Sequence, residues 1–266
     1  MASQALVEIK GVSKTYSSNG GVLPAIDGLS LDLRAGEFVA VLGPSGCGKT
    51  TLMLMVAGLV KPSAGSVVIG GQTVDQPYTD LGIVFQDAVL LDWRSVLDNI
   101  MLQAEIRGLN RSSARRRASD LLRLVGLDGS QEKHPVQLSA GMRQRVSICR
   151  ALLHDPPLLL MDEPFAALDA LARDQLNLDI QHIWQTGQKT VLFITHSIRE
   201  AVFLADRVVL MTPSPGRLAA VMDIDLPRPR SFSMQETVAF GHHLGQIRAL
   251  LGSLGVLEES DMDERP

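Results

Sequence analysis

The stretch EFVAVLGPSGCGKTTLMLMVAGL, residues 37–59, decides the fold of this chain. It begins with a short apolar run of the kind that forms a buried strand and ends in an apolar helical segment. Between them, GPSGCGKT at 43–50 satisfies the pattern GxxxxGK(S/T). A glycine-rich loop between a strand and a helix is the context in which this pattern cradles phosphate. The stretch therefore predicts a phosphate-binding loop at the edge of an α/β sheet.

The loop residues divide the work of holding a nucleotide. The glycines let successive backbone N–H groups point inward at the β-phosphate, Lys49 reaches the β- and γ-phosphates, and the Thr50 hydroxyl binds Mg²⁺. A nucleoside triphosphate and Mg²⁺ are therefore expected at this loop. The predicted nucleotide-binding residues of this segment are Gly43, Pro44, Ser45, Gly46, Cys47, Gly48, Lys49, Thr50 and Thr51.

A second motif, LLLMDEP at 158–164, places Asp162 and Glu163 after an apolar run. Ligands bind at the carboxyl ends of strands in open α/β sheets. Asp162 then suits the water shell of a metal, and Glu163 can polarise an attacking water. Paired acids after an apolar run would by themselves more often be a solvated strand end, but their position downstream of a phosphate loop favours the catalytic interpretation.

The rest of the chain alternates between strands and helices, which predicts an α/β fold with a mainly parallel central sheet. Beyond Pro213 we expect a strand around 218–225, a helix near 234–252 and a frayed acidic tail, EESDMDERP. Predicted strands are 29–34, 37–42, 81–85, 158–162, 190–195 and 207–211, and predicted helices are 48–60, 95–107, 111–125, 139–154, 170–186 and 198–205.

Composition narrows the class of protein. The 266 residues are 45% hydrophobic and 20% charged, as in an ordinary globular protein. A net charge of −4 gives no reason to expect nucleic acid, and the basic run RSSARRR at 111–117 is better explained as a solvated helix face. Two cysteines are too few for a disulfide framework. MASQALVEIKG lacks the apolar core of a leader peptide, and TLMLMVAGLV is about half of the roughly 20 residues that a membrane span needs.

Six motifs in order now define a resemblance: GPSGCGKT, Gln86 after LGIVF, LSAGM, LLLMDEP, AALD, and His196 after LFIT. This set resembles the ATP-binding subunit of an ATP-binding-cassette (ABC) transporter, from about residue 6 to about 225. The resemblance implies a P-loop NTPase core with an N-terminal antiparallel β-subdomain and an inserted α-helical subdomain. It implies an ATPase domain over 5–240, with the insertion at about 87–155, followed by the helix end and tail at 241–266.

The resemblance also implies roles for residues outside the phosphate loop. Tyr16 would stack on adenine, although a Tyr packed under the N-terminal strand is the alternative. Gln86 would contact Mg²⁺ and water, and His196 would bind the γ-phosphate and share catalysis with Glu163. Thr50, Gln86 and Asp162 would then form the metal set. Asp169 would reach across a dimer, although an Asp that begins a helix is also a good N-cap.

The segment LSAGM, residues 138–142, resembles the ABC signature LSGGQ. By itself it predicts a helix start capped by Ser139. In the family this segment caps the γ-phosphate bound to a second copy of the chain, so that Ser139, Ala140, Gly141 and Met142 form a site in trans. Ala140 replaces a glycine and Met142 a glutamine, so turnover or dimer closure can differ. The other motifs are retained, which indicates a competent ATPase.

Two longer stretches, at 85–100 and 192–218, are similar to the nitrate/sulfonate/taurine group of importer ATPases. The expected function is ATP-driven uptake of a small anion or related molecule. The expected partners are a second copy, two permease subunits docking near an exposed Trp93, and an extracytoplasmic solute-binding protein. The expected place is peripheral, at the cytoplasmic face of the inner membrane. An exporter or lipid-transport ATPase remains an alternative, and a soluble non-transport ATPase is a weaker one.

Overall fold

The computed structural model describes residues 5–18 and 21–256, and the predicted acidic tail lies outside them. The chain divides into two compact units. Of the described residues, those at 5–18, 21–79 and 190–256 form unit one, and those at 80–189 form unit two. The phosphate loop belongs to unit one, whereas the signature segment and the paired acids belong to unit two.

Unit one contains an antiparallel sheet with the strand order β2-β1-β4-β5. Its strands are β1 (Ala5–Ser18), β2 (Gly21–Arg34), β4 (Ala64–Ile69) and β5 (Gln72–Thr73). The end of β2 alternates buried and exposed residues from Leu29 to Arg34, because one face packs on the core and the other meets solvent. The expected antiparallel β-subdomain is confirmed.

A second group of strands in unit one has the order β10-β9-β3-β8. β3 (Phe38–Leu42) lies parallel to β8 (Thr190–Ile194) and to β9 (Arg207–Met211), and β10 (Leu218–Asp223) pairs antiparallel with β9. Every residue of β3 and β8 is buried, which explains their unbroken apolar sequences. These strands confirm the predicted segments 37–42, 190–195 and 207–211.

Helices α1 (Lys49–Val56), α6 (Ile198–Leu204) and α7 (Val238–Ser253) complete unit one, with a 3₁₀ segment at Phe232–Glu236. α6 packs against β3 and α7 packs against α6. α1 ends four residues earlier than the predicted limit of 60. Gly58 there has φ +71°, and the N–H of Leu59 donates to the Leu54 carbonyl, so a left-handed glycine closes the helix.

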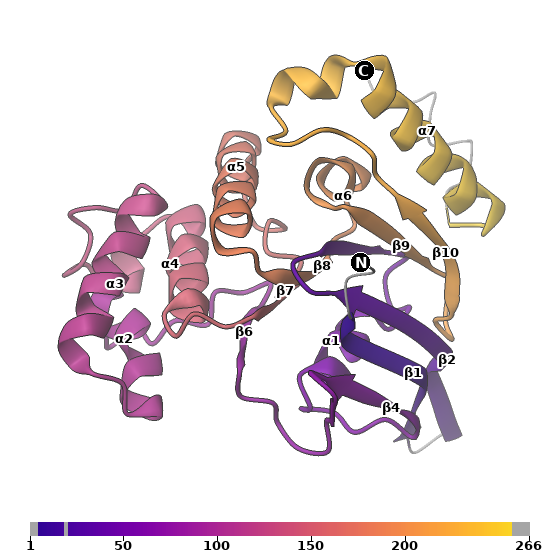
Figure 1. Ribbon diagram of the computed structural model, residues 1–266, viewed down its shortest axis with the longest axis horizontal. Helices are drawn as coiled ribbons and strands as arrows, with labels where there is room; N and C mark the ends of the chain where they lie inside the picture. The colour runs from indigo at the N-terminus through magenta and orange to yellow at the C-terminus, as the bar shows by residue number, and fades with distance from the viewer. Residues whose placement is uncertain (1–4, 19–20, 257–266) are drawn as a thin grey trace. The chain divides into compact units, whose positions relative to one another are not determined.

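Unit two holds two parallel strands and four helices in the described chain. β6 (Leu81–Val84) pairs with β7 (Leu158–Asp162). Figure 1 shows α2, α3 and α4 as one cluster, in agreement with their mutual contacts. The helices are α2 (Val96–Arg107), α3 (Arg111–Leu124), α4 (Ala140–Leu152) and α5 (Ala170–Gly187), with a 3₁₀ turn at Pro135–Gln137.

Capping residues explain where the helices of unit two begin. Ser95 accepts a hydrogen bond from the Asp98 N–H and Asn110 from the Ser113 N–H, so each satisfies an orphan donor. α2 ends at Gly108, which has φ +64°. No strand occurs between β6 and β7 in this described segment. The helices predicted at 95–107, 111–125, 139–154 and 170–186 are confirmed to within two residues at each end.

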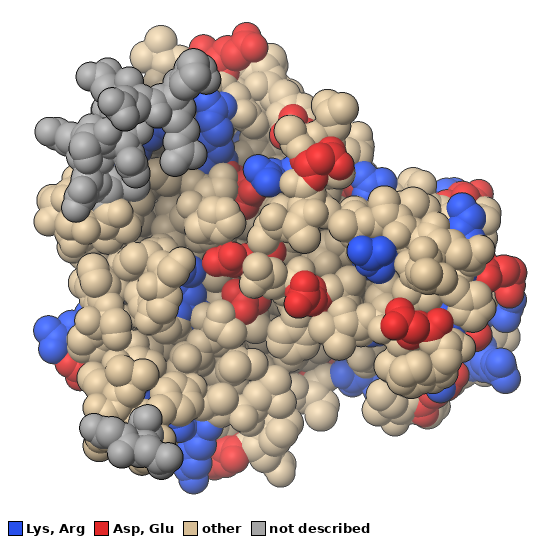
Figure 2. Space-filling model, turned by 180° about the vertical axis from the view of Figure 1, so that it is seen from behind, with Lys and Arg blue, Asp and Glu red and all other residues tan. Residues whose placement is uncertain are grey.

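Charges of both signs are present on one face of the molecule. Figure 2 shows basic and acidic side chains interspersed among other residues on the described part of that face. Among the helices of residues 5–18 and 21–256, none combines the length and apolarity needed to cross a bilayer.

Candidate nucleotide-binding site

Two parallel strands of unit one carry predicted site residues at the same edge. β3 and β8 pair with Val41 opposite Ile194, so their carboxyl ends lie together. β3 runs into the glycine-rich loop at 43–50, and β8 runs into His196. The Thr195 N–H also donates to the Val41 carbonyl, at 3.3 Å. The fold therefore brings the phosphate loop and His196 to one edge of the sheet, where α/β folds bind ligands.

Left-handed glycines shape the phosphate loop. Gly46 has φ +76° and Gly48 has φ +97°, conformations that side chains rarely adopt. Gly48 is the N-cap of α1 and no side chain caps this helix. The first N–H groups of an α-helix have no acceptor within the helix, and the positive end of the helix dipole faces the loop. This arrangement is a ready-made anion site.

Lys49 folds back over the same loop. Its side chain is largely buried, and Nζ donates to the Gly43 carbonyl at 2.8 Å and to the Pro44 carbonyl at 3.0 Å. A flexible ammonium group held by loop carbonyls stays within the loop and remains a point charge for phosphate. The geometry thus places a cation beside the N–H groups at the start of α1.

Cys47 is fully buried in the loop, and burial raises the pKa of its thiol. A thiol with a raised pKa stays protonated at neutral pH and behaves as a small apolar side chain. Gly43 lies against it: a Cβ at Gly43 would approach the Cys47 sulfur to 2.8 Å. Cys47 therefore serves the packing of the loop rather than its chemistry.

Tyr16 lies on β1 and is 39% exposed. Its hydroxyl is 3.5 Å from the Thr51 Oγ1, and the Lys14 Nζ is 5.2 Å from the centre of its ring. The ring thus lies beside the first turn of α1 instead of under the strand in the core. A partly exposed aromatic face next to a phosphate loop is available for stacking on a planar base.

In unit two, predicted site residues also follow the carboxyl ends of two parallel strands. β6 and β7 pair with Val84 opposite Met161, so the segments that follow them share an edge. Gln86, after β6, is exposed, whereas Asp162, the last residue of β7, is 8% exposed. Glu163 has φ +44°, which is uncommon for a residue with a side chain. Backbone strain of this kind collects at functional sites, so its occurrence at Glu163 supports a catalytic role.

Helix α4 holds the segment that contains Gln86. The buried Gln144 donates from Nε2 to the Phe85 carbonyl at 2.9 Å. Arg150 donates to the carbonyls of Ala88 and Val89 at 2.9 and 2.8 Å. Neither contact can be predicted from the sequence, because a polar residue on an amphipathic helix does not reveal which backbone carbonyl it will contact.

The signature segment and Asp169 begin helices α4 and α5. The Ser139 Oγ accepts a hydrogen bond from the Met142 N–H at 3.2 Å, which confirms the predicted cap. Ala140 and Gly141 form the first turn, and their N–H groups have no acceptor within the helix. Asp169 likewise accepts from the Ala172 N–H at 2.9 Å, so the N-cap alternative holds for its side chain.

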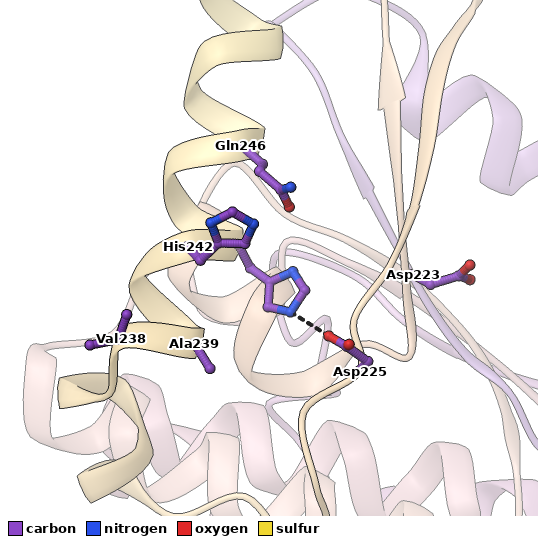
Figure 3. A pocket seen from close by; sticks show the side chains of 7 residues that line it. Asp223, Asp225, Val238, Ala239, His242 and Gln246 are labelled. Carbon is purple, nitrogen blue, oxygen red and sulfur yellow. Dashed lines mark hydrogen bonds and ion pairs between the residues drawn. The ribbon is translucent and has the colours of Figure 1, made fainter.

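A hollow of about 610 Å³ lies in unit one between the end of β10 and α7. The His243 Nε2 lies 2.8 Å from the Asp225 Oδ1, and a dashed line in Figure 3 marks this contact at the labelled Asp225. The hollow contains none of the predicted site residues. Within residues 5–18 and 21–256, no group of three or more His, Cys, Asp or Glu side chains is arranged to hold a metal.

Comparison with known proteins identifies the family. Residues 26–166 match the ABC transporter family. The taurine import ATP-binding protein TauB of Rhizobium johnstonii is 45% identical over 88% of this chain and 91% of its own length. The bicarbonate transport ATP-binding protein CmpD of Synechocystis is 43% identical over 85% of this chain and 81% of its own length.

A solved structure agrees with these relatives. A dimeric ATP-binding cassette in a post-hydrolysis state, bound to ADP and Pi, superimposes with a TM-score of 0.73. It is 28% identical and covers 85% of this chain and 100% of its own. The resemblance expected from the motifs is confirmed, as are the P-loop NTPase fold and the ATPase activity. This chain therefore belongs to the ABC transporter family, as an ATP-binding and ATP-hydrolysing subunit of the nitrate/sulfonate/taurine group.

Proposed function

We propose that this chain powers the uptake of a small anion, such as a sulfonate, bicarbonate or nitrate, through separate permease subunits. The observation that carries the proposal is its similarity over most of its length to one relative named for taurine import and another named for bicarbonate transport. Taurine carries a sulfonate group and bicarbonate is itself an anion, so the substrate class rests on the small anionic group that these solutes share.

The partners follow from the same similarity. Two copies of the chain would close over two nucleotides, with the phosphate loop of one copy facing LSAGM of the other. The dimeric cassettes among the similar solved structures support this pairing. Two permease subunits and an extracytoplasmic solute-binding protein would complete the importer. Trp93 is 75% exposed and offers an apolar contact for a permease, at the cytoplasmic face of the membrane.

Residue roles in hydrolysis are part of the proposal. Tyr16 stacks on adenine, and residues 43–51 hold the phosphates, with Lys49 neutralising their charge. Glu163 orients and polarises the attacking water, and His196 contacts the γ-phosphate. Across the dimer, residues 139–142 cap that phosphate and Asp169 contributes to the interface. The ATPase domain is assigned to residues 5–240, with its helical insertion at about 87–155, and residues 241–266 end the chain.

Mg²⁺ suits the donors assigned to it. The Thr50 hydroxyl, the Gln86 amide and the Asp162 carboxylate offer hard oxygen atoms, which Mg²⁺ prefers. When bound, the ion would supply positive charge to the phosphate oxygens.

Substituting Glu163 tests the catalytic assignment. Glu163→Gln keeps the size of the side chain but removes the carboxylate that polarises water, so turnover falls by about 10²–10⁴-fold. ATP binding is retained and the ATP-bound dimer becomes stable, which size-exclusion chromatography detects. Wild-type turnover in this variant would remove Glu163 from the mechanism.

Transport direction tests the importer assignment. The chain is reconstituted in liposomes with the permease and binding protein encoded beside its gene, and uptake of labelled taurine, bicarbonate and nitrate is measured with ATP on the side of the ATPase. Import of one anion, absent with Glu163→Gln, supports the proposal. ATP-driven movement away from the binding protein, or extraction of lipid, would instead establish the exporter or lipid-transport alternative.

A further inference from the structure

His196 lies in a short turn between β8 and α6 whose flanking residues are both hydrogen-bonded. The Ser197 N–H donates to the Thr195 Oγ1 at 3.0 Å, which closes a turn around His196. In this bond the Thr hydroxyl accepts from the N–H two residues further along the chain, which is a known way in which Ser and Thr fix a turn. The backbone of His196 is therefore held from both sides.

Glu200 anchors that turn. The Thr195 hydroxyl donates a short hydrogen bond to the Glu200 Oε2. The Ser197 Oγ in turn accepts from the Glu200 N–H at 3.3 Å and caps α6. A hydroxyl that accepts one hydrogen bond and donates another has a defined orientation, because its single proton is committed to Glu200. The chain of bonds thus runs from Ser197 through Thr195 to Glu200.

Thr195 and Glu200 are buried, whereas His196 is not. Thr195 is 1% exposed and Glu200 is 7% exposed, whereas the His196 side chain is exposed. Glu200 is therefore buried within unit one, whereas His196 lies at its surface. Removing its carboxylate would leave the buried Thr195 hydroxyl without this acceptor, and a buried polar group that loses its partner rearranges its surroundings.

We propose that Glu200 is a positioning residue that sets the location of the His196 ring through Thr195 and Ser197. The inference rests on the role proposed above for His196. Thr195 also bonds to β3 through the Val41 carbonyl, and β3 leads directly into the phosphate loop. The hydrogen bonds of Glu200 and Thr195 thus fix the position of His196 relative to β3, the strand that leads into the phosphate loop. Such a fixed position matters because reacting groups must be held to within a fraction of an ångström.

The test compares Glu200→Ala and Thr195→Val with the conservative changes Glu200→Gln and Thr195→Ser. The first pair removes the hydrogen bond, so kcat for ATP hydrolysis falls about tenfold, as expected for a ring displaced by less than 1 Å. The Kd for ATP changes less than about twofold, because Tyr16 and the phosphate loop are untouched. The conservative pair retains an acceptor or a hydroxyl, so kcat returns to within about threefold of wild type.

Glu37 provides a matched control in the same unit. It is 8% exposed, and its carboxylate accepts from the Arg34 N–H at 2.8 Å, just before the amino end of β3 and away from the phosphate loop. Glu37→Ala therefore removes a similarly buried carboxylate. It lowers thermal stability while kcat per folded molecule stays at the wild-type value. An equal drop in kcat in both variants would mean that Glu200 is merely structural.

His196→Ala separates failure of this inference from failure of the role on which it rests. Wild-type turnover in His196→Ala would remove the proposed role of His196, and with it the inference. Impaired turnover in His196→Ala together with normal kcat in Glu200→Ala would overturn the positioning role alone. In the double variant, Glu200→Ala has no further effect if it acts through His196, and a full additional tenfold loss would contradict that route. If Glu200→Ala does not fold, Thr195→Val gives the same comparison.

Discussion

Helices α1 and α4 both begin at a predicted phosphate contact, but their first turns are built in different ways. α1 starts at Gly48, with φ +97° and no side-chain cap. α4 starts at Ser139, with φ −65° and a side chain that caps the Met142 N–H. The start of α1 depends on a left-handed backbone conformation that glycine adopts readily, whereas the start of α4 is an ordinary end capped by a side chain.

The difference shows where an added methyl group is tolerated. A Cβ at Gly48 would lie 2.8 Å from the Ala25 carbonyl oxygen and 2.8 Å from the Ile26 Cγ1. A Cβ at Gly141 would lie 3.4 Å from the Ala172 Cβ, an ordinary contact. The phosphate loop is therefore sterically closed to a side chain at Gly48, whereas the signature segment has room for one at Gly141.

Gly48→Ala should have the largest effect. The alanine must adopt a left-handed conformation and also meets backbone at 2.8 Å, so the loop has to move. Stability falls by more than about 1 kcal/mol. A displacement of about 1 Å lowers turnover about 100-fold. Steady-state hydrolysis and thermal melting measure the two effects.

Gly46→Ala is the matched control for that steric argument. Gly46 has φ +76°, but nothing lies within 4 Å of its added Cβ. The variant therefore carries the conformational strain without the clash, and it should lose less stability than Gly48→Ala. Equal losses in the two variants would show that strain alone, and not close packing, requires glycine in the loop.

Ser139 separates capping from phosphate contact at the other helix. Ser139→Ala removes the cap of α4, which costs about 1 kcal/mol, and we expect turnover to fall about tenfold. Ser139→Asp restores a cap but adds a negative charge that repels a γ-phosphate. Stability should then recover while turnover stays low. Recovery of both would show that Ser139 only caps the helix.

The sequence predicts the phosphate loop and the secondary structure, but it predicts few of the long-range side-chain contacts. The motif GPSGCGKT and the apolar runs predict the strands, the helices and the phosphate loop, because strand-loop-helix order and apolar periodicity are local signals. The links from Gln144 and Arg150 to the segment after β6 join residues 59 to 62 positions apart, so no local pattern predicts them. Glu200 is an intermediate case: Ser197 and Glu200 form a visible S-x-x-E capping pattern, but the bond to Thr195 needs the folded turn.

Gly141→Ala should have a small effect. Its added Cβ makes only ordinary contacts with Ala172 and Leu168, at 3.4 and 3.7 Å. Alanine is also the better helix former, so stability should stay the same or rise by up to about 1 kcal/mol. Turnover should stay within about threefold of wild type, since the backbone N–H is kept. A loss of 100-fold would mean that the γ-phosphate approaches Gly141 too closely for a methyl group, and the two helix starts would then be alike.

Ala140→Gly should have the smallest effect, and it removes a methyl group from the start of α4 where the other glycine variants add one. It restores the glycine of the family signature and removes one methyl group from the first turn of α4, where Ala140 is half-buried. Turnover should be equal or higher, because the methyl group no longer limits the approach of phosphate. Stability should fall by up to about 1 kcal/mol, since glycine costs more backbone entropy in a helix. Hydrolysis rates and melting temperatures measured side by side check both signs. A large loss of turnover would show that the alanine is adapted to this site, so that the methyl group contributes a contact that the family signature lacks.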